Sequence, residues 1–338
     1  MLGGAVGHPR HADWSAYSYG LPYYLFQVSQ LQAHGTYYLI LTVLRAKLAA
    51  PRTYVLKYVR PTPVGYDNLS EVKATHLSET SDHVRYSGLV AGVIFVAGTS
   101  FTLVYWLLGA FYIYVISTIT VLFMKRDAHR NLGHRTLGFL FRGFFNGLIW
   151  LGAVKVDDEV LEPLADLPGP LIVASNHPSL WDAPLLIRRF VTVSCIMKAE
   201  ITNNPILLGG TRFAGFLPNR PKLDMVRAAT GHLKSGGRLL LFPEGTRTRD
   251  QSKRVNKFRP GLALMAKTAD CPILPIFLSM NSPYMQKGWP IWKMPPMPIV
   301  VTAEVGELIQ PDEKENTHQF SERLENYFRE ELRRRFPR

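Results

Sequence analysis

The sequence contains only two cysteines among its 338 residues, Cys195 and Cys271, and neither lies in a Cys-x-x-Cys pair or in a cluster with histidine. Two isolated cysteines cannot supply a disulfide framework or the ligand set of a structural zinc site. We therefore expect a protein of a reducing compartment, with no disulfide scaffold and no metal centre.

A serine nucleophile elbow is also missing, because no Gly-x-Ser-x-Gly motif occurs. Neither cysteine is flanked in the sequence by a base that could activate its thiol. The sequence therefore does not indicate catalysis through a covalent enzyme intermediate.

Charged residues are scarce, at 19% of the chain, whereas 47% is hydrophobic. The scarcity is greatest from Gly88 to Met124, where 37 consecutive positions have no charge, which is a membrane signal. One helix of that length would measure about 55 Å at 1.5 Å per residue, well beyond the roughly 30 Å of a bilayer core. It must tilt, extend beyond the membrane, or break at Gly98 to Ser100 or at Gly109. A single span, a re-entrant helical pair and a buried core hairpin all stay open.

A basic flank follows this apolar run, and it begins at Lys125 and Arg126. The positive-inside tendency then predicts a membrane protein with its active site on the cytoplasmic face. We expect 88–148 to form a membrane-anchoring and interfacial helical segment. The aromatic residues among its later charges favour either an amphipathic helix on an anionic leaflet or a helix packed on the domain; they are Phe139, Phe141, Phe144, Phe145 and Trp150.

Residues 1–87 are interpreted as a poorly defined N-terminal extension. They lack the basic region and apolar run of a signal peptide. Tyr37 to Leu48 is apolar but too short to span a bilayer, so it fits an interfacial helix, a packed helix or a stretch upstream of the true start. Thr53 to Ser87 is polar and without a clear period, which is typical of loop or disorder.

From Val154 onward, short apolar runs alternate with charged helical segments. This alternation predicts an α/β domain at 149–338, with a mostly parallel sheet flanked by helices. The expected strands are 171–174, 191–197, 238–242, 273–277 and 299–305. The expected helices are 183–189, 225–235, 262–269 and a charged terminal helix at 320–335.

The first polar motif is Asn-His-Pro-Ser-Leu-Trp-Asp at 176–182, directly after the apolar run 171–174. Because Pro178 suits the first turn of a helix, His177 should precede the helix and Asp182 should lie within its first turn. Asp182 could then orient His177 as a general base and stabilise its imidazolium. The alternative is a capping box formed by Ser179 and Asp182, with His177 as an ordinary loop residue.

The second polar motif, Phe-Pro-Glu-Gly-Thr-Arg at 242–247, also follows a predicted strand. Gly245 would let the backbone approach a ligand, and Thr246 and Arg247 could donate to a phosphate. An ordinary turn with exposed charges is the alternative. The net charge of +13 favours an anionic partner, and nucleic acid, an anionic bilayer and phosphate-bearing or acidic substrates all fit that sign.

Together these motifs resemble the glycerolipid acyltransferase family, which includes 1-acylglycerol-3-phosphate acyltransferases. Two weaker blocks occur in the family's order: one from Lys198 to Arg220 that contains Phe-Leu-Pro-Asn-Arg, and Pro-Ile-Leu-Pro-Ile at 272–276. The similarity covers roughly 150–307. Leu217-Pro218 replaces a pair that is more often β-branched, and Phe258 to Gly261 replaces a lysine-rich version, which concerns the acceptor pocket rather than the chemistry.

The resemblance implies acyl transfer from a thioester donor, acyl-CoA or an acidic acyl carrier protein, to the free hydroxyl of 1-acylglycerol-3-phosphate. His177 would be the general base and Asp182 its orienter. Glu244, Gly245, Thr246 and Arg247 would bind the acceptor head group, with Arg220 as a further phosphate ligand. Lys198 is a weaker candidate, and a plain surface lysine is its alternative.

The implied partners are membrane lipids, a lysophospholipid acceptor and the thioester donor, without nucleic acid, metal or a tightly bound cofactor. Another acceptor, either a lyso-aminolipid or a different lysophospholipid, is the nearest alternative. A catalytically inactive membrane-binding protein and thioester hydrolysis are the others.

Overall fold

A computed structural model describes residues 85–165, 167, 169–202, 210, 212–219 and 222–337. The expectations for the N-terminal extension therefore fall almost wholly outside the described residues. Seven strands form one sheet in the order β1-β7-β6-β2-β5-β3-β4. The strands are β1 (Val154–Asp157), β2 (Leu171–Ser175), β3 (Val193–Met197), β4 (Leu217–Pro218), β5 (Arg238–Leu241), β6 (Ile273–Met280) and β7 (Ile299–Val305).

The sheet is mostly parallel, because β6 and β7 are its one antiparallel pair within the described chain. The predicted α/β class is thus confirmed, and the five predicted strands are all present. The sequence did not predict β1, which has four residues, or β4, which has two. Such short strands leave too few positions for a hydrophobic period.

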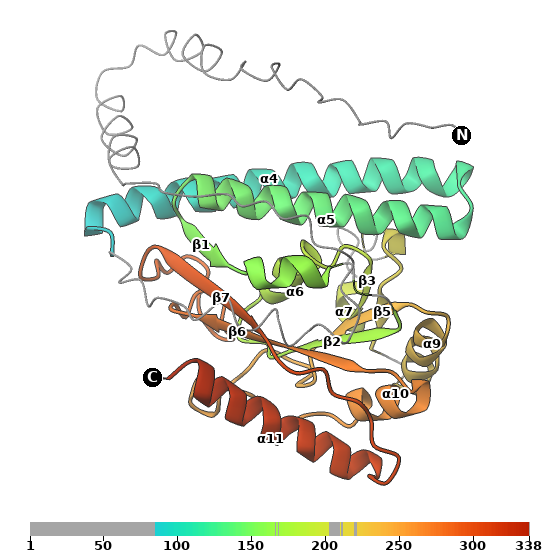
Figure 1. The fold of residues 1–338 in the computed structure, drawn as a ribbon. Helices are drawn as coiled ribbons and strands as arrows, with labels where there is room; N and C mark the ends of the chain where they lie inside the picture. The colour runs from blue at the N-terminus through green and yellow to red at the C-terminus, as the bar shows by residue number, and fades with distance from the viewer. Residues whose placement is uncertain are drawn as a thin grey trace, which may run out of the picture. The chain divides into compact units, whose positions relative to one another are not determined.

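Helices cover both faces of the sheet (Figure 1). On one side lie α4 (Gly88–Phe123), α5 (Arg126–Trp150), α6 (Asp182–Ile187) and the short η4 (Glu159–Leu164), and on the other lie α9 (Lys222–Lys234), α10 (Gly261–Ala269) and α11 (Thr317–Arg335). The turns α7 (Ala199–Thr202) and η5 (Gln251–Lys253) complete the set. The predicted helices correspond to α6, α9, α10 and α11, and each predicted start lies within three residues of the observed one.

Strand β2 shows why the core has two halves. All five of its residues are buried, as expected for a central parallel strand. Leu171 and Val173 face the core beneath α5 and α6, whereas Ile172 and Ala174 face the core beneath α9, α10 and α11. The alternation of side chains along a strand therefore places β2 between two hydrophobic layers.

Helix α4 runs unbroken for 36 residues, so of the alternatives left open by the sequence, a break at Gly98 to Ser100 or at Gly109 does not occur. The hydroxyls of Thr99 and Thr102 donate to backbone carbonyls four residues earlier, at 2.8 and 2.7 Å, and stay within the helix. A Cβ at Gly98 would lie 3.4 Å from the Cβ of Ala153, which is an ordinary packing distance, so the helix neither breaks at this glycine nor requires it.

Helices α4 and α5 form an antiparallel hairpin (Figure 1). Its seam is built by aromatic rings of α4 that lie over glycines of α5. A Cβ at Gly147 would lie 2.2 Å from the ring of Phe101, and one at Gly143 would lie 2.5 Å from the hydroxyl of Tyr105. Small residues on α5 thus let the two helices approach closely.

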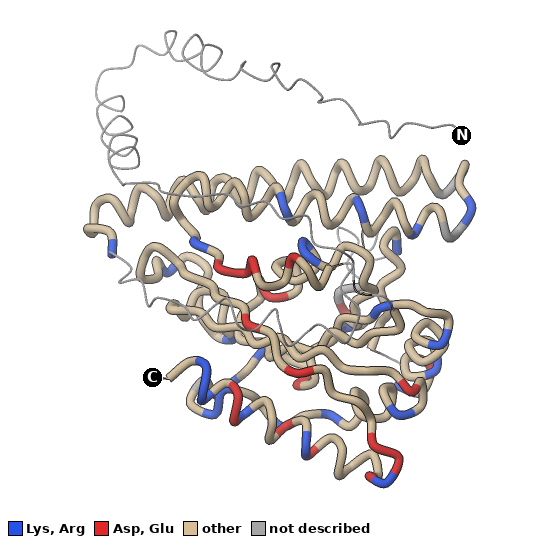
Figure 2. The backbone as a smooth tube through the Cα atoms, in the orientation of Figure 1, with Lys and Arg blue, Asp and Glu red and all other residues tan. Residues whose placement is uncertain are grey.

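The aromatic residues of α5 divide between the two predicted roles. Phe141, Phe144 and Phe145 are buried and pack on the domain, whereas Phe139 and Trp150 are exposed. In the part of the chain that the structure describes, α4 is the one helix long and apolar enough to cross a membrane. Figure 2 shows α4 without charge along its length and basic residues at the bend and along α5.

Candidate active site

The candidate site lies where three neighbouring parallel strands end. Strands β2, β5 and β3 are adjacent in the sheet, so their carboxyl ends meet at one edge. His177 follows β2, the motif 242–247 follows β5 and Lys198 follows β3. Ligands of open α/β sheets bind at this kind of edge. The sheet order therefore brings together motifs that are 67 residues apart in the sequence.

His177 and Asp182 form a dyad with the geometry predicted from Pro178. Helix α6 begins at Asp182, and the Nδ1 of His177 lies 2.8 Å from the Oδ2 of Asp182. The His177 side chain is 17% exposed and that of Asp182 is 1% exposed. Because Nδ1 faces the carboxylate, Nε2 is the nitrogen that can exchange protons with a substrate.

The carboxylate of Asp182 has two donors in this turn. Its Oδ2 also accepts a hydrogen bond of 2.7 Å from the backbone N–H of Ser179. Burial raises the pKa of Asp182, and the hydrogen bonds from His177 and Ser179 offset part of that rise. A buried carboxylate in contact with an imidazole stabilises the imidazolium, which is what an orienting aspartate does in a catalytic dyad.

The capping box expected at Ser179 is only half formed. The hydroxyl of Ser179 accepts from the backbone N–H of Trp181 at 3.2 Å, not from that of Asp182, and no side chain caps α6. The expectation that Ser179 caps the helix is therefore wrong. Asp182 is held instead by its own side chain, which reaches back to the N–H of Ser179.

Glu244 is buried next to His177, with 2% of its surface exposed. Its carboxylate accepts hydrogen bonds from the backbone N–H of His177 at 2.9 Å and of Asn256 at 2.8 Å. The hydroxyl of Thr248 donates to both oxygens, at 2.9 and 3.0 Å. Donors of this chain thus already bind the carboxylate, and Glu244 links the turn after β2 to the turn after β5.

Two further residues, which were not among the predicted site residues, help to hold His177 in place. Asn176 exchanges two hydrogen bonds of 2.8 Å with the backbone of Leu278 and so fixes the end of β2 against β6. The ring of Phe242 stacks on the imidazole of His177, with centroids 4.0 Å apart and planes 17° apart. Their places as the first residues of the two motifs were the only signal in the sequence.

Arg247 is held by a third segment, the loop between β6 and β7. Its Nη1 donates to the carbonyl of Met285 at 2.8 Å and to that of Gln286 at 3.4 Å. The Met285 carbonyl also accepts from the backbone N–H of Leu180, within the turn between β2 and α6, at 3.1 Å. One carbonyl thus contacts both motifs.

Met285 adopts a left-handed backbone conformation, with φ 62°, which is uncommon for a residue with a side chain. We expect Met285→Asn to keep acyl transfer within about twofold, because asparagine tolerates this conformation, whereas Met285→Val should lower kcat/KM about tenfold. Both variants remove the methionine side chain, so the comparison isolates the backbone. Steady-state kinetics provide the measurement, and equal values for the two variants would exclude a backbone role.

Four basic residues lie near one another, and the charge of one of them, Arg247, also acts on Asp182 of the dyad. Desolvation and then the charges of Arg249, Lys198 and Arg247 lower the pKa of the exposed Lys287. A neighbouring cation, Arg259, lies over Gly245, where an added Cβ would come within 2.5 Å of its Nε. Lys198 therefore does lie near Arg247, whereas Arg220 falls outside the described residues. Arg249, Lys287 and Arg259 were not among the predicted site residues, because they lie outside the matched motifs or depart from the family pattern.

The cysteines lie apart from this chemistry. Burial raises the pKa of Cys195 and of Cys271 to about 12, so neither thiol forms much thiolate at neutral pH. Where the structure is described, no three histidine, cysteine, aspartate or glutamate side chains are grouped as metal ligands would be.

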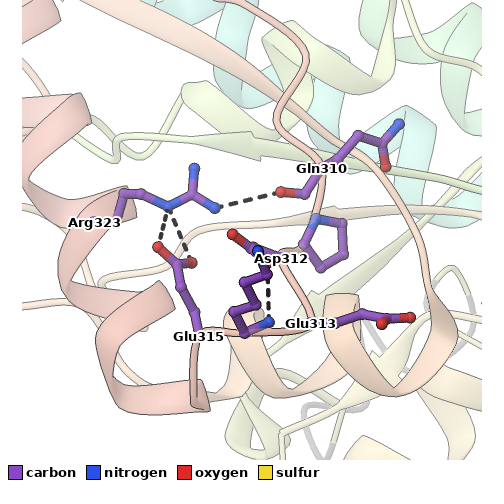
Figure 3. Close-up of a pocket in the computed structure, with 7 residues that line it drawn as sticks. Gln310, Asp312, Glu313, Glu315 and Arg323 are labelled. Carbon is purple, nitrogen blue, oxygen red and sulfur yellow. Dashed lines mark hydrogen bonds and ion pairs between the residues drawn. The ribbon is translucent and has the colours of Figure 1, made fainter.

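A surface hollow lies elsewhere, beside the start of α11 (Figure 3). It is lined by 310–315 and Arg323, and none of the candidate site residues takes part. Arg323 donates to Glu315 at 2.8 and 3.1 Å, so these two charged side chains of the hollow are paired with each other. The candidate site is therefore defined by its side chains and not by this hollow.

Comparisons with known proteins identify similar sequences that are acyltransferases. The model of the acyltransferase family matches 154–279. The chain is 28% identical over 139 residues to a chloroplastic 1-acyl-sn-glycerol-3-phosphate acyltransferase of Brassica napus, covering 40% of each protein. It is 28% identical over 163 residues to a 1-acyl-sn-glycerol-3-phosphate acyltransferase of Pseudomonas aeruginosa, covering 45% of this chain and 61% of that protein.

A solved structure shares the fold. The crystal structure of the 1-acyl-sn-glycerophosphate acyltransferase of Thermotoga maritima superposes with a TM-score of 0.55 at 20% identity, covering 74% of this chain and 98% of that one. The family-model match at 154–279 and the matched relatives identify a domain of the acyltransferase class. Together with the shared fold, they support the glycerolipid acyltransferase family. The chain spans about two fifths of the length of the plant relatives it matches.

Proposed function

We propose that this protein transfers a fatty acyl chain from a thioester donor to the free hydroxyl of 1-acylglycerol-3-phosphate, which forms phosphatidic acid. The observation that supports this best is the His177–Asp182 dyad next to a group of basic side chains at one edge of the sheet. A base for the hydroxyl and cations for a phosphate are the two needs of this reaction. The matched relatives are named as 1-acyl-sn-glycerol-3-phosphate acyltransferases, which supports the same acceptor.

In the proposed mechanism, the Nε2 of His177 takes the hydroxyl proton of the acceptor as its oxygen attacks the thioester carbonyl. Asp182 stabilises the imidazolium that forms. The tetrahedral intermediate collapses, the carbon–sulfur bond breaks, and the imidazolium returns its proton to the departing thiolate. The products are the ester and the free thiol, and the enzyme ends as it began. No covalent bond to the protein is required, in keeping with the buried, weakly acidic thiols.

Arg247 is the residue we propose for the acceptor phosphate, with Gly245, Thr246 and Lys198 around it. Arg220 stays a further proposed phosphate ligand. Arg249 and Lys287 extend the basic surface and suit the phosphates of coenzyme A or the acidic face of a carrier protein. We now assign Glu244 to positioning, because its carboxylate already has donors from His177, Thr248 and Asn256.

We further propose that α4 holds the protein in a membrane. Leu103, Leu107 and Phe111 are among its exposed large side chains, and water is a poor solvent for such a face. The basic residues after α4 favour the cytoplasmic side for the dyad. A lysolipid acceptor resides in the same bilayer, so an anchored site meets its substrate by lateral diffusion.

The positioning role of Glu244 gives a sharp test. We expect Glu244→Gln to lower kcat at least about tenfold and stability by about 1 to 3 kcal/mol, because an amide N–H₂ would face backbone donors at the buried site. Thr248→Val, which removes one donor to the same carboxylate, should do less. Kinetics and thermal unfolding measure both. A rise in acceptor KM alone, with stability unchanged, would instead favour direct contact with the head group.

The proposal as a whole is tested with a panel of acceptors and donors on purified protein in lipid nanodiscs. The acceptors are 1-acylglycerol-3-phosphate, other lysophospholipids, a lyso-aminolipid and buffer alone, each with labelled acyl-CoA or acyl carrier protein. We expect labelled phosphatidic acid from the first acceptor. Transfer to a different lysolipid alone would correct the acceptor, and release of free fatty acid without any stimulation by an acceptor would indicate hydrolysis.

A further inference from the structure

The loop between β6 and β7 exposes a compact group of large apolar side chains. Ile291, Trp292 and Met294 are exposed, and Trp292 most of all at 79%. We name 289–294 the tip segment. Its other aromatic residue, Trp289, lies under the ammonium group of Lys293, which is 4.6 Å from the ring centroid. The tip segment therefore combines exposed apolar surface with a positive charge.

Both ends of this loop contact the start of α4 or the residues just before it. Before the tip segment, the ring of Tyr284 packs edge-on against Phe95, with centroids 6.2 Å apart. After it, the carbonyl of Met297 accepts a hydrogen bond of 3.1 Å from the backbone N–H of Tyr86. The loop that carries the tip segment is thus anchored at the end of α4 where Leu89, Val93 and Val96 are exposed.

Several donors in and next to the tip segment are already paired or absent. Pro290 has no N–H, and the N–H groups of Trp289 and Lys293 donate to carbonyls within the loop at 3.2 and 3.0 Å. The indole N–H of Trp289 donates to the carbonyl of Lys293 at 3.1 Å. Pro295 and Pro296 follow and lack N–H groups as well. Entry into a less polar medium therefore costs less than it would if all of these groups carried unpaired donors.

We propose that the tip segment is a second membrane contact, separate from α4, which inserts Ile291, Trp292 and Met294 into the interfacial zone of an anionic bilayer. Tryptophan prefers this zone because its ring is apolar and its N–H is polar, and lysine adds attraction to anionic lipid. Lys287 and Lys293 supply that charge. The proposal concerns where the protein touches lipid and does not depend on the acyl acceptor.

This contact matters for the site because the same loop holds the catalytic turn. Met285 contacts Leu180 and Arg247 through its carbonyl, and Tyr284 packs against Trp181 with centroids 5.3 Å apart. Only three residues separate Met285 from Trp289. A tip segment seated in the interface fixes the dyad at a constant depth relative to the lipid head groups.

The test is a fluorescent probe attached at Ile291→Cys in the full chain, in nanodiscs that contain phosphatidylglycerol. Maleimide labelling at neutral pH will select the introduced thiol, because Cys195 and Cys271 are buried and burial raises the pKa of each to about 12. The matched control is Glu313→Cys, an exposed position in the turn before α11 (Figure 3). Trp292 stays in place in both proteins.

We expect nitroxide carried on a lipid acyl chain near the head group to quench the probe at 291 at least about threefold more than the probe at 313. We expect iodide in the water to show the opposite order. Equal quenching at the two positions would overturn the proposal. Shielding of position 291 from iodide without quenching by the lipid nitroxide would mean that protein covers the tip segment, and would overturn it as well.

Discussion

Replacing His177 with alanine should lower acyl transfer by at least about 10²-fold, the usual contribution of a general base. The loss should appear in kcat, because the imidazole acts on the reacting hydroxyl and not on the remote parts of either substrate. Asp182→Asn should also lose activity, since an amide at that position cannot stabilise the imidazolium that forms on His177. Labelled acyl transfer by the purified variants in nanodiscs provides the measurement.

The chain offers a matched control for this experiment. His318 lies on α11, is exposed and pairs with Glu322 at 3.5 Å, far in the sequence from either motif. His318→Ala should leave activity unchanged. If His177→Ala kept more than roughly a tenth of the wild-type rate, the base assignment would be wrong, and the dyad would be a structural turn.

Arg247→Ala should raise the acceptor KM, or lower kcat/KM, by about 10- to 100-fold. A hydrogen bond to a charged group contributes about 1.5 to 3 kcal/mol, and each 1.4 kcal/mol corresponds to a factor of ten. Arg247→Lys keeps the charge but cannot reproduce the planar guanidinium, so we expect an intermediate value. Kinetics with varied lysophosphatidic acid give both constants.

A second acceptor separates phosphate binding from support of the loop, because Arg247 also donates to the carbonyls of Met285 and Gln286. With a monoacylglycerol, which lacks the phosphate, the penalty of Arg247→Ala should largely disappear. An equal penalty with both acceptors would show that Arg247 acts only by holding the loop, and would remove it from the head-group site.

The two motifs illustrate how far local sequence reasoning extends. The strand before His177, the proline after it and the aspartate five residues on predicted a dyad in a strand-to-helix turn, and the 2.8 Å contact confirms that geometry. Local reasoning was less successful at two other positions. Gly98 lies within an unbroken helix and not at a break, and the hydroxyl of Ser179 accepts from the N–H of Trp181 instead of capping α6.

Glu244 shows that local sequence patterns are also a limited guide to the role of a residue. Its place in a polar turn beside Gly245, Thr246 and Arg247 favoured contact with a ligand, and nothing in the motif indicates burial. The carboxylate is buried because β5 lies directly beside β2, which sets the turn after one strand against the turn after the other. Strand adjacency is a property of sheet order, and local patterns contain no information about it.

The sequence by itself determined the apolar length of α4, the α/β alternation after Val154 and the local shape of the turn that contains His177, because propensity, period and proline geometry act over a few residues. Only the tertiary structure decided which strands are neighbours, and hence that Lys198, Arg247 and Lys287 lie near one dyad. It also decided that Met285 contacts both motifs and that the loop that carries the tip segment contacts the start of α4. The physical reason is that these contacts join residues far apart in the chain, and the burial of a shared core brings them together.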